Sequence, residues 1–140
     1  MPSRLAPFFR TFQRGPGPRA RRACQVLLVL LMAVVCALAF APHPPPALDT
    51  GWDKRNHLLA FASLALVAEL AFWPAARRRA KVLLGLLAFG GFIELVQSQI
   101  PERSAEWVDL LADGLGIALG LALVAALVRL SRGRPGTQSR

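Results

Sequence analysis

The feature that most constrains this chain is a series of four apolar stretches, each close to the ~20 residues that an α-helix needs to cross a bilayer. They cover residues 24–41, 57–75, 82–100 and 107–130. Only short polar connections separate them, so neighbouring helices must lie antiparallel and pack together. The sequence predicts an all-α, polytopic transmembrane bundle of four antiparallel helices over residues 23–131, with basic tails at 1–22 and 132–140.

The composition fits a protein that faces lipid. Of the 140 residues, 54% are apolar, which is more than an ordinary soluble domain of this size uses. A net charge of +9 would suggest a nucleic-acid partner for a soluble protein, but here the distribution of the charges argues for lipid instead. We therefore expect membrane lipid, and no nucleic acid, as the partner.

The basic residues fall almost entirely on one side of the predicted spans. All but three of the 17 lie in the N-terminal tail, in the connection after the second span or near the C-terminus; the exceptions are Lys54, Arg55 and Arg103. Lys and Arg collect on cytoplasmic loops. We therefore expect a multi-pass protein of the bacterial inner (cytoplasmic) membrane with both termini in the cytoplasm.

The first apolar stretch has a second interpretation. A basic segment precedes it and the small-residue sequence Ala39-Phe40-Ala41 ends it, as in a signal peptide. Pro42 would then occupy the first mature position, which is a poor substrate for cleavage. We expect the stretch to be retained as a span, with cleavage as the alternative.

Polar residues gather at the outer ends of the predicted spans, where ionisable groups are costly and therefore indicate a site. Glu94 and Asp113 each lie six residues from the outer end of their span, roughly 9 Å deep at 1.5 Å per residue, so they could meet. We expect a pocket open to the outer leaflet, formed by Lys54, His57, Glu94, Gln97, Arg103, Glu106, Asp109 and Asp113.

Roles within this pocket follow from the residue types. As a hypothesis, the catalytic residues are His57, Glu94 and Asp113, and the binding residues are Lys54, Gln97, Arg103 and Asp109. His57 and Glu94 could divide general base and acid roles while Arg103 holds a phosphate or carboxylate. The alternative is structural: His57 as an interfacial residue, Arg103 as an ion-pair partner, and Asp109 as a charge favoured by the helix dipole.

A metal site built from His57, Glu94 and Asp113 is chemically possible. The nearby Arg103 argues against a cation there, so we expect no metal and no cofactor.

Two further features lie outside this pocket. Glu69 is twelve residues from His57, which turns it away by about 120°. We expect Glu69 to snorkel or to pair towards the cytoplasmic arginines. Gly116 and Gly120 form a small-xxx-small pattern that lets another helix approach closely.

Three fragments occur in a fixed order across roughly residues 50–120: Asp53-Lys54-x-x-His57, Gly90-x-x-x-Glu94-x-x-Gln97, and Arg103-Ser104 followed by Asp109-x-x-x-Asp113-x-x-Gly116-x-x-x-Gly120. In these fragments the chain resembles the VanZ-like family of small bacterial membrane proteins. It departs from many members at Leu58, where they have Phe, and at Asp113, where they have Asn. The resemblance implies a four-span envelope protein, and the founding member of the family is linked to low-level teicoplanin resistance.

Three classes of function stay open. The first is an enzyme acting on a lipid-linked or amphiphilic envelope substrate at the outer leaflet, and the second is a non-catalytic protein that binds such a ligand. The third is an assembly partner in a homo- or hetero-oligomeric membrane complex. The sequence has no recognisable nucleophile signature with Ser or Cys beside a base and no glycine-rich phosphate loop, so it does not choose among these classes.

Overall fold

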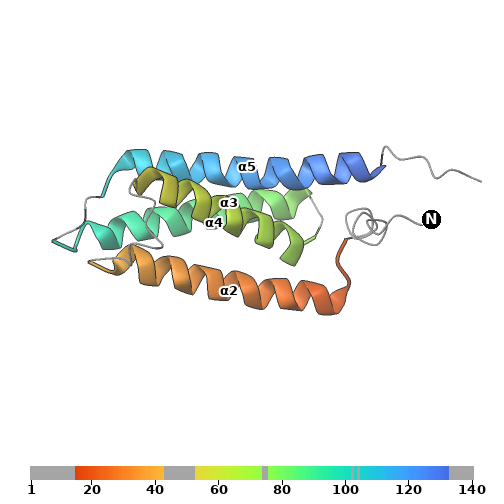
Figure 1. The fold of residues 1–140 in the computed structure, drawn as a ribbon, viewed down its shortest axis with the longest axis horizontal. Coiled ribbons are helices and arrows are strands. Elements are labelled where there is room, and N and C mark those ends of the chain that lie inside the picture. Colours follow the sequence, from red (N-terminus) through yellow and green to blue (C-terminus); the bar gives the residue numbers. More distant parts are fainter. Residues whose placement is uncertain (1–14, 43–52, 74–75, 102, 104, 133–140) are drawn as a thin grey trace, which may run out of the picture.

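The computed structural model describes residues 15–42, 53–73, 76–101, 103 and 105–132. Within these residues the chain forms four α-helices, α2 (Pro18–Phe40), α3 (Asp53–Ala71), α4 (Ala76–Gln97) and α5 (Trp107–Arg132), and no strand. Consecutive helices run in opposite directions along one long axis (Figure 1). The prediction of an all-α bundle of four antiparallel helices is confirmed.

The two ends of this bundle carry different residues. We call one end the polar end; there α2 and α4 finish and α3 and α5 begin, on the left of Figure 1. At the opposite end, which we call the basic end, α2 and α4 begin and α3 and α5 finish. Basic residues near that end include Arg19, Arg21, Arg22, Arg79, Lys81 and Arg129.

The helices do not stop where the apolar stretches stop. α3 starts at Asp53 and finishes at Ala71, and α4 starts at Ala76, so both are shifted towards the N-terminus relative to the predicted spans. α2 starts at Pro18, inside the predicted tail, and Pro is well suited to the first turn of a helix. Arg and Lys are good helix formers, so helices continue through residues too polar for a bilayer interior.

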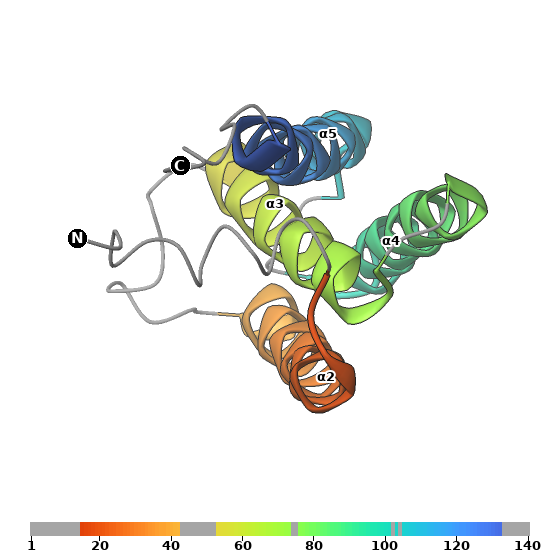
Figure 2. The same cartoon turned by 90° about the vertical axis from the view of Figure 1, so that its right-hand side faces the viewer.

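Three of the described helices contain segments long and apolar enough to cross a membrane, namely Pro18–Phe40, Arg79–Gln97 and Trp107–Leu130. α3 is not among them; charged residues begin it and Glu69 lies near its end. α3 is the central helix, packed most extensively on α5 and also in contact with α2 and α4 (Figure 2). A helix that faces protein on most sides needs fewer apolar residues than one that faces lipid.

Exposure in this bundle is opposite to that of a water-soluble protein. Leu111, Leu115, Leu119 and Leu123 follow one face of α5 at steps of four and are 50% to 67% exposed. The buried polar side chains are His57, Glu69, Glu94, Gln97, Asp109 and Asp113. An apolar exterior with the ionisable side chains held inside, beside an apolar core, suits a bilayer, because lipid cannot hydrogen-bond with polar groups.

Two glycines bring α5 into close contact with α3. A methyl group on Gly116 would lie 2.4 Å from the carbonyl oxygen of Leu58, and one on Gly120 would lie 2.5 Å from that of Ala62. Only glycine allows the two backbones to approach this closely. The predicted packing role of this face is confirmed, and the contact places the first turns of α5 beside the start of α3.

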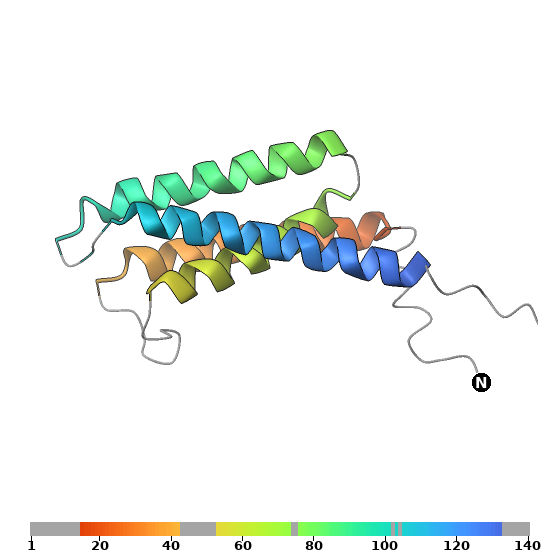
Figure 3. The same cartoon turned by 90° about the horizontal axis from the view of Figure 1, so that it is seen from above.

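α4 lies against α5 at the polar end and diverges from it towards the basic end (Figure 3). Near the basic end, α2, α3 and α4 border a cavity of about 500 Å³ whose lining includes Met32, Phe72 and Leu86. α4 therefore approaches α5 closely at the polar end, where the predicted site residues lie, whereas it contacts α3 near the basic end as well, through Arg79 and Glu69.

Candidate functional site

The His57 side chain lies at the centre of the polar cluster, one turn into α3. Its Nδ1 atom is 2.9 Å from Oδ1 of Asp113 on α5, and both side chains are buried. With Asp113 ionised, its carboxylate can only accept a hydrogen bond, and Nδ1 is then the donor. The lone pair of the ring is then on Nε2, on the opposite side of the imidazole.

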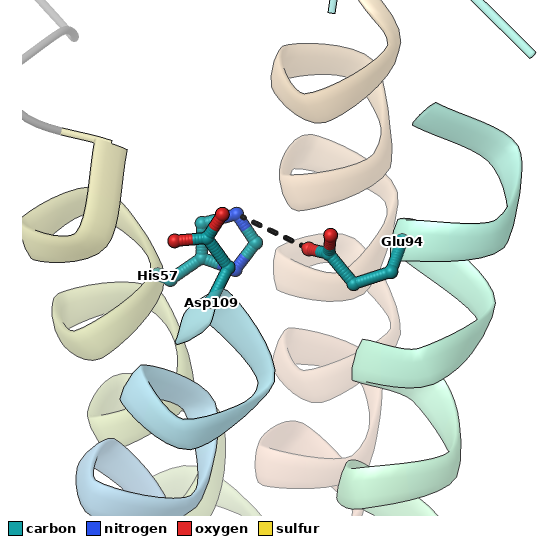
Figure 4. A group of neighbouring side chains, drawn as sticks. All are labelled: His57, Glu94 and Asp109. Atoms are coloured by element: carbon teal, nitrogen blue, oxygen red, sulfur yellow. Dashed lines mark ion pairs between the residues drawn. The ribbon is translucent and has the colours of Figure 1, made fainter. Parts of the chain in front are cut away.

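Glu94 on α4 faces this Nε2 atom. Its Oε1 atom lies 3.8 Å from Nε2, which is too long for a hydrogen bond but leaves a gap that one small atom could bridge (Figure 4). The other oxygen, Oε2, accepts a 3.0 Å hydrogen bond from the backbone amide of Glu106. This bond fixes the carboxylate so that Oε1 points towards His57, and Oε1 has no hydrogen-bond partner among the described residues.

Asp109 closes the third side of the cluster from α5, one turn before Asp113. One side-chain atom each of His57, Glu94 and Asp109 lie within 4.8 Å of one another (Figure 4). α3, α4 and α5 thus each contribute one electron-pair donor to the same small region of the bundle.

Lys54 supplies the positive charge at the rim of the cluster. Its Nζ atom lies 2.7 Å from Oε2 of Glu106 and 3.7 Å from Oδ1 of Asp109. Lys54 precedes the predicted second span, and its hydrogen bond with Glu106 raises the pKa of the ammonium group. Lys54 is therefore charged at neutral pH, with part of its side chain exposed.

Two apolar positions shape the cluster. A methyl group on Gly90 would lie 2.2 Å from Oδ2 of Asp113, so the missing side chain on α4 makes room for that carboxylate. Phe61, one turn after His57 on α3, is fully buried and its ring lies parallel to the imidazole, with centroids 6.5 Å apart. Gly90 therefore lets α4 approach Asp113, and Phe61, itself part of the apolar core, lies beside the His57 ring.

Gln97 and Arg103 contact α2. Nε2 of Gln97 donates to the carbonyl oxygen of Ala39 at 3.1 Å. Arg103 donates from Nε and Nη2 to the carbonyl of Ala41 and from Nη2 to that of Leu38, at 2.8 to 3.1 Å. The last carbonyls of a helix lack partners within it, so both side chains cap α2. The anion-binding role of Arg103 stays a prediction, as does the binding role of Gln97.

This capping role was not predicted from the sequence. The stripe of Glu94 and Gln97 indicated one shared polar face, but it did not show which neighbouring helix ends within reach of that face. The signal that could have indicated it is the end of the first apolar stretch at Ala41, at the same predicted depth as Arg103.

Glu69 lies at the opposite end of α3, away from the cluster. It is buried and accepts a hydrogen bond from Nε of Arg79 on α4. The prediction that Glu69 pairs towards the basic side is confirmed.

The fold and the cluster together define a class: a small helical membrane protein with buried ionisable side chains from three helices at one end. A family model described as VanZ/LLP1 matches residues 24–129, which is most of the chain. The chain belongs to the VanZ/LLP1 family, and the matched region contains every residue of the cluster. No curated protein and no solved structure matches the chain.

Proposed function

We propose that this protein is an intramembrane enzyme that acts on a lipid-linked or amphiphilic substrate of the bacterial cell envelope, at the outer leaflet of the inner membrane. The observation that carries the proposal is the position of His57 between two carboxylates, with Asp113 on Nδ1 and Glu94 facing Nε2. A histidine oriented by one carboxylate and facing a second acid is an arrangement suited to proton transfer.

The proposed chemistry is hydrolysis of a polar bond in the substrate. Nε2 of His57 takes a proton from water as the water oxygen bonds to the electrophilic atom, and the carboxyl group of Glu94 gives a proton to the departing oxygen. Asp113 stabilises the imidazolium that forms, because it accepts the hydrogen bond from Nδ1. The proton then returns from His57 to Glu94 across the 3.8 Å gap, which restores the starting state.

The exposed rim supports an approach from the polar end. Lys54 and Glu106 are partly exposed, whereas His57 and Glu94 below them are buried. A substrate with an anionic headgroup would meet the Lys54 ammonium first, while its apolar chain stays in lipid beside the exposed leucines of α5.

The outer-leaflet location depends on the orientation of the chain, for which the distribution of Lys and Arg is the support. A reporter that is active only outside the cytoplasm should remain silent when it is fused after Arg140. A strong signal from that fusion would reverse the orientation and place the polar end in the cytoplasm.

A non-catalytic binding or assembly role is the second candidate, and the internal pairing favours it. Gln97 and Arg103 are engaged by α2, and Lys54 is engaged by Glu106. If holding helices together were the task of these groups, their charges would be dispensable for function provided that the bundle stayed intact.

Complementation of a deletion strain with an envelope phenotype separates these candidates. We expect His57→Ala and Glu94→Gln to fail, with membrane levels close to those of the parent. Glu69→Gln is the matched control, because it neutralises a buried carboxylate at the other end of the same bundle, and it should complement. Full complementation by both cluster variants would exclude the enzymatic role.

A further inference from the structure

We propose that the polar end binds one first-row divalent metal ion through Nε2 of His57, a carboxylate oxygen of Glu94 and a carboxylate oxygen of Asp109. The inference rests on the function proposed above, because it names what the same site would hold. With an ion bound, His57 and Glu94 would serve as its ligands instead of transferring protons, and the ion would activate the water. The inference itself concerns binding alone and can be measured without any substrate.

The geometry of the three donors supports a shared ion. The three atoms come from α3, α4 and α5 and lie within 4.8 Å of one another. Metal bonds to imidazole nitrogen and carboxylate oxygen are about 2.0–2.2 Å long, so two ligands of one ion are at most about 4.4 Å apart. The 3.8 Å between Nε2 of His57 and Oε1 of Glu94 is already inside that limit, and the 4.8 Å that encloses all three atoms is only slightly above it.

Glu94 gives the second, independent indication of a ligand. The residue is 9% exposed, and its Oε1 atom has no hydrogen-bond partner among the described residues. Oε2 is already fixed by the amide of Glu106, so the carboxylate cannot turn Oε1 away without losing that bond. A buried acceptor left unsatisfied is costly, and a cation between Glu94 and His57 would remove that cost.

Asp113 acts on the site through His57. Its Oδ1 atom lies 2.9 Å from Nδ1, and an ionised Asp113 that accepts from Nδ1 leaves the lone pair of the ring on Nε2. A carboxylate behind the imidazole is a frequent outer partner of metal-binding histidines, where it orients the ring and makes it a stronger ligand. Asp113 is therefore a positioning residue here, whereas the sequence suggested it as a direct ligand.

The sequence-based objection to a metal came from Arg103, and the contacts of Arg103 weaken it. The guanidinium donates to the carbonyl oxygens of Leu38 and Ala41 at the end of α2. These bonds direct the guanidinium donors of Arg103 towards backbone oxygen atoms of α2. They do not direct them towards His57, Glu94 and Asp109, which would hold the ion.

The donor set indicates the class of metal. One imidazole and two carboxylates are borderline to hard ligands, which suit Zn²⁺ and Mn²⁺ better than soft ions such as Cu⁺. Three protein ligands leave at least one coordination position for water, as in catalytic metal sites. A divalent ion would also offset the excess of carboxyl groups over cations in this buried cluster.

Equilibrium dialysis of the purified full-length chain tests the proposal. The protein is kept in detergent without an affinity tag, stripped with chelator, and dialysed separately against Zn²⁺ and Mn²⁺. We expect saturable binding of one ion per chain. Glu94→Gln and Asp109→Asn should weaken it at least ~10-fold, and Asp113→Asn about 10–100-fold. Glu69→Gln is the matched control and should bind as the parent does.

The absence of saturable binding of either ion up to about 1 mM, the weak limit for protein metal sites, would overturn the proposal. Parent-like binding by both ligand variants would do so too. If a variant fails to fold, pulsed electron paramagnetic resonance of Mn²⁺ on the parent decides: imidazole nitrogen coupling supports the site, and its absence contradicts it. Failure here leaves the complementation result intact, so the two proposals fall separately.

Discussion

α3 carries a buried ionisable side chain near each end, and the two have different surroundings. Near the basic end, Glu69 pairs with Arg79, whose own side chain is half exposed. Near the polar end, His57 lies between Asp113 and Glu94, with Asp109 beside them. One end thus joins an acid to a base, and the other gathers acids around a histidine.

The two ends differ in how the free-energy cost of burying their ionisable groups is offset. In a balanced ion pair, the attraction between the two hydrogen-bonded charges largely offsets the free-energy cost of burying them. Removing one partner therefore lowers stability. Around His57, four carboxyl groups, those of Glu94, Glu106, Asp109 and Asp113, share the basic groups Lys54 and His57, while Arg103 at the same end donates to carbonyl oxygens of α2. Such an excess is costly unless protons or a cation compensate it, and costly buried groups inside membranes mark functional sites.

The largest loss of stability is expected from changes at the close contact of Gly116 and Gly120 on α5 with α3. Leucine at both Gly116 and Gly120 would drive side chains into the backbone of α3, with a loss of roughly 2–6 kcal/mol from overpacking at two sites. Thermal unfolding in detergent measures it. The control is leucine at Gly85 and Gly91, where an added methyl group meets nothing within 4 Å. Equal losses in both double variants would mean that the contact does not hold the ends in register.

A smaller effect is expected from Arg79→Gln at the basic end. The change leaves the carboxylate of Glu69 buried without its charged partner, and an unsatisfied buried group costs about 1–3 kcal/mol. The melting temperature should fall while complementation is retained. Arg19→Gln, which changes an exposed arginine near the same end, should leave the melting temperature unchanged. A loss of complementation in Arg79→Gln at normal expression would assign function to the basic end as well.

The smallest effect on stability is expected from Lys54→Gln at the polar end. Lys54 and Glu106 are both partly exposed, and such ion pairs contribute less than about 1 kcal/mol. Because the change increases the negative excess, it should tighten Mn²⁺ binding in dialysis. A melting temperature as low as that of Arg79→Gln would remove the proposed contrast between the ends.

The sequence predicted the helices and the residues of the cluster because both follow from local patterns. Apolar length indicates helices in a membrane, and the steps of three and four residues place Glu94 with Gln97 and Asp109 with Asp113 on single faces. The depth comparison of Glu94 with Asp113 also agrees with the structure, where both lie against His57.

The sequence did not predict which atoms meet. The helix bounds differed because apolar length reports the expected thickness of the bilayer, whereas Arg and Lys continue the helix beyond it. The contacts of Arg103 with the carbonyl oxygens of Leu38 and Ala41 were not predicted, because they depend on where α2 ends in space. The placement of Asp113 on Nδ1 of His57, with Asp109 near His57 and Glu94, depends on the rotation of α5 against α3, where Gly116 and Gly120 make close contact.

The most direct test of the contrast between the two ends is the melting temperature of Glu94→Gln against that of Glu69→Gln, both measured in detergent after chelator treatment. Glu94→Gln removes a costly buried ionisable group and retains an acceptor for the amide of Glu106, so it should melt at or above the parent temperature. Glu69→Gln loses the charge that pairs with Arg79 and should melt below it. The opposite order, with Glu94→Gln the less stable variant, would contradict the account, because the polar end would then be the part that holds the bundle together.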